Sequence, residues 1–310
     1  MAATASFRSL GSYLKRLSKP LIVGSMAIAL SLGASPAWAG DPFRTSDPRS
    51  IGDQTEAAFR AMFEQGNYVE AGRLLESAED DEPMSHAMVA SLAYLEEDWD
   101  TMGRRATLTR EAAEALVETD PLRGNLYMAV GHFMEGAHVI MTQGTLRGSP
   151  TALMKLQSVF SHINAAEAID ATDPELNLVK GFMDLMIAVN LPFADPEDAI
   201  SRLENYAAPP YVAQRGIAVA CRDLDDHGCA TTAIDRAIAA APNNPDLYYL
   251  KAQILVQQGD EAASLEFFDL ALESRDNFPT ALGNQIAWER CRTNNRVTDG
   301  NQNCDRLRRQ

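Results

Sequence analysis

The chain has 310 residues, of which 46% are hydrophobic and 23% charged, so it can bury a sizeable core and is not disordered. It carries 27 Lys and Arg against 43 Asp and Glu, a formal net charge of −16. A surface this negative would repel a phosphate backbone, and 7% aromatic residues are too few for a base-stacking platform. The composition therefore excludes nucleic acid as a partner.

Residues 1–39 have the features of a secretory signal peptide. Residues 1–19 hold four basic residues and no acid, residues 21–34 are an apolar run, and Ala37-Trp38-Ala39 places small residues before Gly40. The alternative is an uncleaved anchor, because residues 20–40 carry no charge and could just span a bilayer. We expect cleavage and an exported protein, in the periplasm or, if the source is photosynthetic, in the thylakoid lumen.

Beyond residue 50 the apolar pattern has helical periodicity, interrupted by turns. Ala237-Ile238 and Ala271-Leu272 lie 34 residues apart, each near the end of a helix that follows a Gly-containing turn, and residues 242–245 separate the two units. Near the start, Gly66-Asn67-Tyr68 forms a similar turn before a helix that Pro83 ends. Repetition at a fixed period indicates stacked supersecondary units.

These positions resemble the tetratricopeptide (TPR) repeat, an antiparallel helix pair of 34 residues. The matching residues are Gly66, Tyr68, Ala71, Ala78 and Pro83 in one unit, and Gly259, Asp260, Phe268 and Ala271 in another. The resemblance implies an all-α fold, a TPR-like α-solenoid of about six antiparallel helix pairs plus a C-terminal capping helix. An alternative is two helical subdomains divided near Pro209-Pro210.

The implied organisation is a signal peptide (1–39), an extended N-terminal linker (40–51), a TPR-like domain (52–292) and a basic C-terminal tail (293–310). The units run over residues 52–85, 86–121, 124–174, 175–208, 211–244 and 245–278, with a last helix over 279–292. The unit 124–174 departs from the family pattern, because its helices are stretched by two or more turns.

The opening of the mature chain is similar to an exported TPR family of cyanobacteria. The similarity rests on Asp41-Pro42-Phe43-Arg44, Ile51-Gly52, residues 55–59 and residues 63–68. Because the role of that family is not established, the similarity implies a compartment and a fold but no mechanism.

All four cysteines, Cys221, Cys229, Cys291 and Cys304, lie in the last third of the chain. In an exported protein an even number indicates disulfides, with three connectivities, of which we favour the pairing of sequence neighbours. A bond between Cys221 and Cys229 would staple a helical hairpin, and the second bond would clamp the tail to the last helix. The alternatives for the first pair are a redox couple or a metal site with His227 and neighbouring aspartates.

The sequence contains none of the strings H-E-x-x-H, G-x-S-x-G, G-x-G-x-x-G and G-x-x-x-x-G-K-[ST], which mark zinc, nucleophile and nucleotide sites. His132 and His138 are six residues apart, so they point to different sides of a helix and cannot chelate together. The acidic clusters 79–82 and 96–98 are expected in solvated turns. We therefore expect no enzymatic activity, no cofactor and no metal. The alternative function is enzymatic: a hydrolase that uses acidic residues of the enlarged unit 124–174.

The resemblance also implies a binding surface. In the TPR family the first helix of each pair lines a concave groove that holds a peptide or partner helix. At the corresponding positions of the predicted units of this chain, the expected groove residues are Arg60, Phe63, Tyr94, Arg215, Val219, Arg222, Tyr249, Gln253, Val256 and Arg290. Arg215 and Arg222 are seven residues apart and could bind a carboxylate, or they could pair with the protein's own acids. The carboxylate clamp of the family is not reproduced, because Val219 and Leu250 replace polar residues.

The hypothesis is an exported protein–protein interaction module or assembly scaffold that binds an unidentified peptide or protein. The alternative from the same compartment is a chaperone-like holder of unfolded or membrane-protein segments, suggested by the residues around Met128, Phe133, Met134 and Met141. Residues 290–310 have a net charge of +4 and could contact anionic lipid headgroups, although we favour a polar cap for the last helix.

Overall fold

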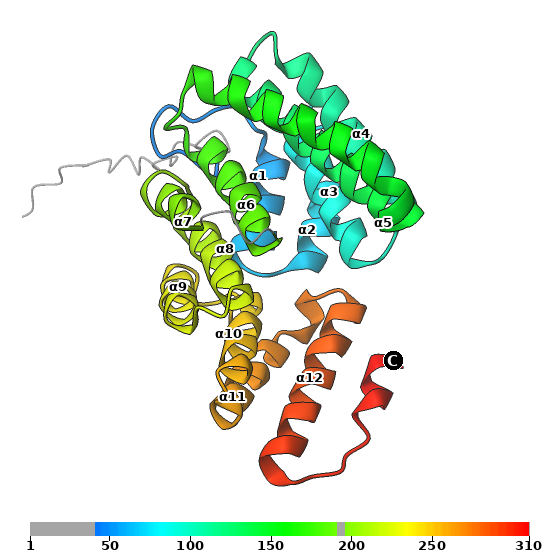
Figure 1. Cartoon of the computed structure of the whole chain (residues 1–310), viewed down its shortest axis with the longest axis vertical. Helices are drawn as coiled ribbons and strands as arrows, with labels where there is room; N and C mark the ends of the chain where they lie inside the picture. The colour runs from blue at the N-terminus through cyan, green and yellow to red at the C-terminus, as the bar shows by residue number, and fades with distance from the viewer. Residues whose placement is uncertain (1–40, 191–195, 310) are drawn as a thin grey trace, which may run out of the picture. The chain divides into compact units, whose positions relative to one another are not determined.

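A computed structural model describes residues 41–190 and 196–309 of the protein (Figure 1). All regular secondary structure in these ranges is helical, so the predicted all-α class is confirmed. No helix in the described ranges is long and apolar enough to cross a membrane. The predicted signal peptide lies outside the described residues.

The helices follow one another with short connections, and proline or an aspartate cap begins most of them. Asp98, Asp120 and Asp226 each accept a backbone N–H three residues on, which satisfies a donor that the first turn leaves free. In chain order the helices are α1 (Asp53–Phe59), α2 (Tyr68–Leu75), α3 (Pro83–Leu95), α4 (Trp99–Leu116), α5 (Pro121–Ile169), α6 (Pro174–Asn190), α7 (Pro196–Asn205), α8 (Pro210–Asp223), α9 (His227–Ala240), α10 (Pro245–Gln257), α11 (Glu261–Glu273) and α12 (Thr280–Thr298). A π-helical turn η1 (Arg60–Glu64) extends α1, and η2 (Arg275–Asn277) and η3 (Cys304–Arg309) are 3-10 turns.

The element α5 is a hairpin of two long arms. Gly144 has a positive φ of 76°, which glycine adopts more readily than other residues. It separates a first arm, residues 121–143, from a second arm, residues 145–169. The arms run antiparallel, because Gly136 lies against Ala152 and the His132 and His162 rings stack with centroids 5.7 Å apart. This hairpin is the enlarged unit expected over residues 124–174.

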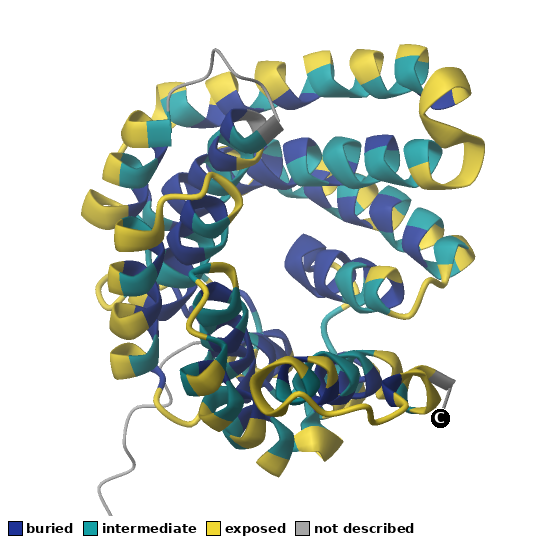
Figure 2. Cartoon of the chain, turned by 60° about the horizontal axis from the view of Figure 1, so that its bottom comes forward, coloured by how far each residue is buried: buried dark blue, intermediate teal, exposed yellow. Residues whose placement is uncertain are grey.

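Helices adjacent in sequence pack against each other: α3 on α4, α6 on α7, α8 on α9 and α10 on α11. The first arm of α5 also packs closely on α4, where a Cβ at Gly131 would lie 2.9 Å from the backbone nitrogen of Arg110. Along most of the helices buried and exposed residues alternate with the helical period (Figure 2), but residues 83–93 of α3 and residues 122–140 of α5 include no exposed residue.

The first helices also contact elements far along the chain. The side-chain amide of Asn244 donates a hydrogen bond to the carbonyl of Phe63 at 2.9 Å, and the Tyr68 ring lies 6.0 Å from that of Phe278. In addition, η1 contacts α8 and α2 contacts η2. The α1–α2 region therefore packs on its neighbour α3 and also on elements from the last third of the chain.

Residues 41–51 have no helix, as predicted, but they are not a free linker. Phe43 and Ile51 are buried in the core, and Arg44 forms ion pairs with Asp41 at 2.9 Å and with Glu175 at 3.3 Å. The segment is held in place because a guanidinium and an aromatic ring both enter the interior of the helical domain.

The predicted boundary at residue 292 is also wrong, because α12 extends to Thr298 and ends where Asp299 adopts a left-handed conformation with φ of 51°. The predicted basic tail then folds back as η3. Trp288 donates Nε1–H to Asp305 at 3.1 Å, and the guanidinium of Arg308 lies 4.6 Å from the centre of the indole ring.

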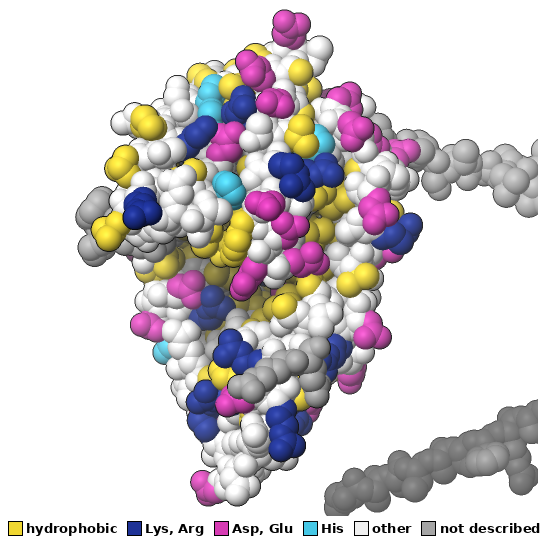
Figure 3. Space-filling model, turned by 90° about the vertical axis from the view of Figure 1, so that its right-hand side faces the viewer, with side chains coloured by type: hydrophobic (Ala, Val, Ile, Leu, Met, Phe, Trp, Pro, Cys, Tyr) yellow, Lys and Arg dark blue, Asp and Glu magenta, His cyan; other side chains and the backbone are white. Residues whose placement is uncertain are grey.

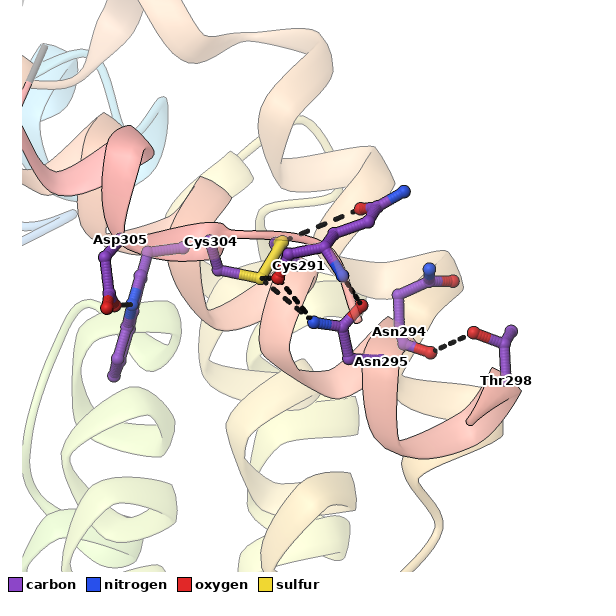
Figure 4. The surroundings of a disulfide bond; sticks show 8 residues. Cys291, Asn294, Asn295, Thr298, Cys304 and Asp305 are labelled. Atoms are coloured by element: carbon purple, nitrogen blue, oxygen red, sulfur yellow. Dashed lines mark hydrogen bonds between the residues drawn. A yellow bond between two sulfur atoms is a disulfide. The ribbon is translucent and has the colours of Figure 1, made fainter. Parts of the chain in front are cut away.

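The cysteines pair as sequence neighbours, in agreement with the favoured connectivity. Cys221 at the end of α8 bonds to Cys229 at the start of α9, and Cys291 in α12 bonds to Cys304 (Figure 4). The Cα atoms are 5.7 Å apart in each pair. Two disulfides indicate an oxidising, exported compartment.

The α5 hairpin carries a charged cluster that makes its stability depend on pH. Burial alone would raise the pKa of Glu135, but hydrogen bonds from Lys155 at 2.5 Å and Arg110 at 3.1 Å outweigh it, so the pKa is lowered. A lowered pKa in the folded state stabilises the fold above the ordinary pKa of a glutamate, and this stabilisation is lost as the pH falls.

We expect Glu135→Gln to lower the free energy of unfolding by about 1 kcal/mol at neutral pH. The difference from the wild type should shrink as the pH falls from neutral towards pH 3, because the folded carboxyl then takes up a proton and loses its ion pairs. Urea denaturation of both chains at the two pH values measures this. A deficit that is equal at both would show that the ion pairs of Glu135 contribute nothing.

Candidate binding groove

An apolar groove of about 320 Å³ opens between α1 with η1, α3, the first arm of α5, α6 and α8. Almost all of its lining is aromatic or aliphatic. The lining residues are Phe43, Phe59, Phe63, Met84, Ala87, Met88, Ser91, Tyr127, Val130, Phe133, Met134, Leu178, Val179, Phe182, Met183, Met186 and Val212. Hydrophobic side chains gather in a hollow of the face shown in Figure 3.

The helical period explains why these residues share one surface. Met84, Met88 and Ser91 are spaced by four and three residues along α3, so they lie on one side of that helix. Tyr127, Val130 and Met134 are spaced by three and four residues along α5 and likewise lie on one side. The helices approach closely where a residue is small: the ring of Phe182 on α6 occupies the space that a side chain at Gly216 on α8 would need.

Three phenylalanines form one wall of the groove. The Phe43 and Phe59 rings meet edge to face with centroids 5.0 Å apart, and Phe63 lies 4.8 Å from Phe59. These residues come from the N-terminal segment, α1 and η1, so the first part of the described chain completes the apolar surface.

A buried ionic network holds the helices that line the groove. Arg123 on α5, only 1% exposed, bonds to both carboxylate oxygens of Glu82 at 2.8 and 3.0 Å and to Glu175 on α6 at 3.0 Å. The hydroxyl of the groove residue Tyr127 donates to Glu175 at 2.9 Å. Burial, reinforced by the nearby Glu175 carboxylate, raises the pKa of Tyr127, so the hydroxyl stays protonated. The network therefore fixes the relative positions of α3, α5 and α6.

A more polar hollow of about 330 Å³ continues from the apolar groove, because Phe182 and Met186 line both. Arg215, Val219 and Asp223 of α8 also line this hollow. Arg215 is held by Asp246 at 2.6 Å, as the self-pairing alternative expected.

A second polar hollow, of about 450 Å³, lies between α8, α10 and α12. Arg222, Gln253 and Val256 line it together with Trp288 and Arg292. Arg222 donates to the amide oxygen of Gln253 at 2.8 Å.

Six of the ten predicted groove residues line one of these three hollows: Phe63, Arg215, Val219, Arg222, Gln253 and Val256. The other four have different surroundings. Arg60 pairs with Glu56 and Glu64, the exposed Tyr94 packs on Trp99, Tyr249 is buried and donates to Glu289, and Arg290 pairs with Asp269 on α11.

The sequence frame missed the groove residues of α3 and α6. The available signal was the spacing of Met84 and Met88, and of Phe182 with Met183 and Met186, at three to four residues. Phe133 and Met134 were noted in the sequence as an apolar cluster, and both line the groove.

The described residues contain no group of three or more His, Cys, Asp or Glu placed to hold a metal ion. Near the first disulfide, Asp226 caps α9 and Asp225 accepts from Gln257, so these aspartates have structural partners. No family model, curated protein or solved structure matches the chain.

Proposed function

We propose that this protein is an exported helical-repeat protein of the TPR type that binds an apolar segment of a partner polypeptide. The apolar groove between α1, α3, α5, α6 and α8 carries this proposal. Five methionines and five phenylalanines line it, and its only side-chain hydroxyls are those of Ser91 and Tyr127. A concave, mostly apolar surface with few polar groups is the usual form of a binding site.

Two further observations support the TPR assignment. Helices α9 and α11 begin at His227 and Glu261, which are 34 residues apart, and are 14 and 13 residues long. Successive pairs also present their first helices, α3, α5, α6 and α8, to the groove. The disulfides support export, and we propose the periplasm or the thylakoid lumen as the compartment.

The lining of the cavity in the enlarged unit favours binding over catalysis. The enlarged unit contains a cavity of about 530 Å³ between the arms of α5, and no carboxylate lines it. The hydrolase alternative required converging acids in that unit. We therefore propose an interaction module or assembly scaffold without enzymatic activity.

A chaperone-like holder is the second candidate, because methionine side chains are flexible and adapt to different apolar partners. Met84, Met88, Met134, Met183 and Met186 all line the groove. A scaffold would select one family of related sequences, whereas a holder would accept many unrelated apolar segments with weak affinity.

The experiment is selection of binders from a displayed random peptide library on the full chain, followed by affinity measurement. Ser91→Trp should fill the groove and weaken the binding of selected peptides at least tenfold, because the indole occupies the space of the ligand. Ser201→Trp is the matched control, since Ser201 is an exposed residue of α7 and lies outside the groove lining. It should leave the affinity unchanged.

Peptides of one related sequence that lose affinity in Ser91→Trp support the scaffold. Many unrelated apolar peptides with the same loss support the holder. Selected peptides that bind both variants with wild-type affinity would show that the groove is not the binding site.

A further inference from the structure

The second arm of the α5 hairpin carries an exposed apolar stripe. Leu146, Leu153 and Phe160 are 96%, 61% and 43% exposed, and their seven-residue spacing places them on one side of the helix. Met154, next to the stripe, is 62% exposed. Apolar residues gathered on one helix face, unlike single exposed ones, mark an interaction surface. The stripe lies outside the groove and has no part in the proposed function.

The charge around the stripe is unlike that of the rest of the chain. Residues 136–166 contain no Asp or Glu, although the chain has 43 of them. Arg147, beside the most exposed leucine, forms no ion pair with any described residue. Helix α4 packs on the first arm of the hairpin, where Gly103 lies against His138 and Gly131 against Arg110.

We propose that the exposed face of the second α5 arm docks on an anionic phospholipid surface. Leu146, Leu153 and Phe160 would enter the boundary between headgroups and acyl chains, and Arg147 would lie at the level of the phosphates. Helices that lie in a membrane interface combine an apolar face with basic residues in this way. The absence of acids over residues 136–166 removes the repulsion that the rest of the chain would meet there.

A second copy of the chain fits this face less well. Two stripes facing each other would bring two Arg147 side chains to a surface that offers no acid to pair with them. A lipid phosphate supplies the missing charge.

The test places its probe on the stripe itself, because the apolar leader of the full chain could also bind vesicles. Leu146→Trp introduces an indole whose quenching by brominated acyl chains reports insertion at that position. Ser201→Trp on α7 is the control indole. The vesicles are phosphatidylcholine with phosphatidylglycerol, or phosphatidylcholine alone.

We expect the indole of Leu146→Trp to be quenched on vesicles with phosphatidylglycerol, and the control indole to be quenched no more than the wild-type tryptophans. Adding Arg147→Gln should weaken binding to these vesicles about fivefold. Adding Leu153→Asp and Phe160→Asp should abolish the quenching. All of these residues are exposed, and thermal denaturation checks that the variants fold.

Equal quenching of the two indoles, or quenching that the aspartate substitutions leave intact, would overturn the proposal. So would a dimer in sedimentation velocity that dissociates on Leu153→Asp with Phe160→Asp while no quenching occurs. That result would assign the stripe to a second copy of the chain.

Discussion

Replacing Arg123 by methionine is expected to lower the free energy of unfolding by about 3–5 kcal/mol, one of the largest single-residue effects in this protein. The side chain is 1% exposed and bonds to Glu82 and Glu175, which are 6% and 0% exposed. Without the guanidinium, both carboxylates keep the cost of burial and lose their main opposite charge. Urea denaturation at neutral pH, followed by circular dichroism, measures the loss.

Arg73→Met is the matched control. Arg73 pairs with Glu70 at 2.6 Å on the surface of α2, where solvent screens the interaction, so its loss should be small. Equal losses in the two variants would contradict a dominant role for the buried network. Glu82→Gln with Glu175→Gln in the Arg123→Met background should recover part of the loss, because the unpaired buried charges are then gone.

The Arg123→Met deficit should also shrink at acid pH. Burial already raises the pKa of Glu82 in the wild type, and loss of Arg123 raises it further. A carboxyl whose pKa is raised in the folded state binds its proton more tightly there than in the unfolded chain. Folding stability therefore increases as the pH falls through this raised pKa towards the ordinary pKa of a glutamate. Denaturation of the variant at pH 7 and near pH 5 tests the direction.

Reduction of both disulfides is expected to lower the free energy of unfolding by about 5 kcal/mol, the second large effect. The bonded cysteines are 8 and 13 positions apart in the sequence. Each bond is expected to contribute about 2–3 kcal/mol to the free energy of unfolding, because it restricts the unfolded chain. The two contributions should add, because one bond joins α8 to α9 and the other holds η3 on α12, with no shared partner.

Urea denaturation with and without a reductant measures the total. Cys221→Ser with Cys229→Ser, and Cys291→Ser with Cys304→Ser, measure each bond separately, and each pair should account for about half of the loss. Four free thiols in the protein recovered from an exported fraction would contradict both disulfides.

Of the ten residues that the sequence suggested for a groove, only Phe63 lines the apolar groove. Arg215, Val219, Arg222, Gln253 and Val256, suggested on α8 and α10, line the two polar hollows. On α3 the frame named Tyr94, which packs on Trp99, and missed the methionines that line the groove. On α6 it named no residue, because the long α5 hairpin interrupts the period before that helix.

The sequence alone determined the features that depend on neighbouring residues. The helical class follows from local periodicity, capping and turn residues. The sequence allowed three cysteine connectivities and favoured the pairing of neighbours, which the structure has. These signals act within a few turns of helix, so one sequence suffices to detect them.

Only the tertiary structure decided which distant residues meet. Arg44 pairs with Glu175 across 131 positions, and Asn244 bonds to Phe63 across 181. Such contacts depend on how each helix packs on those before it along the whole chain, and no local pattern encodes that arrangement. For the same reason the sequence did not distinguish a free linker from the packed segment 41–51.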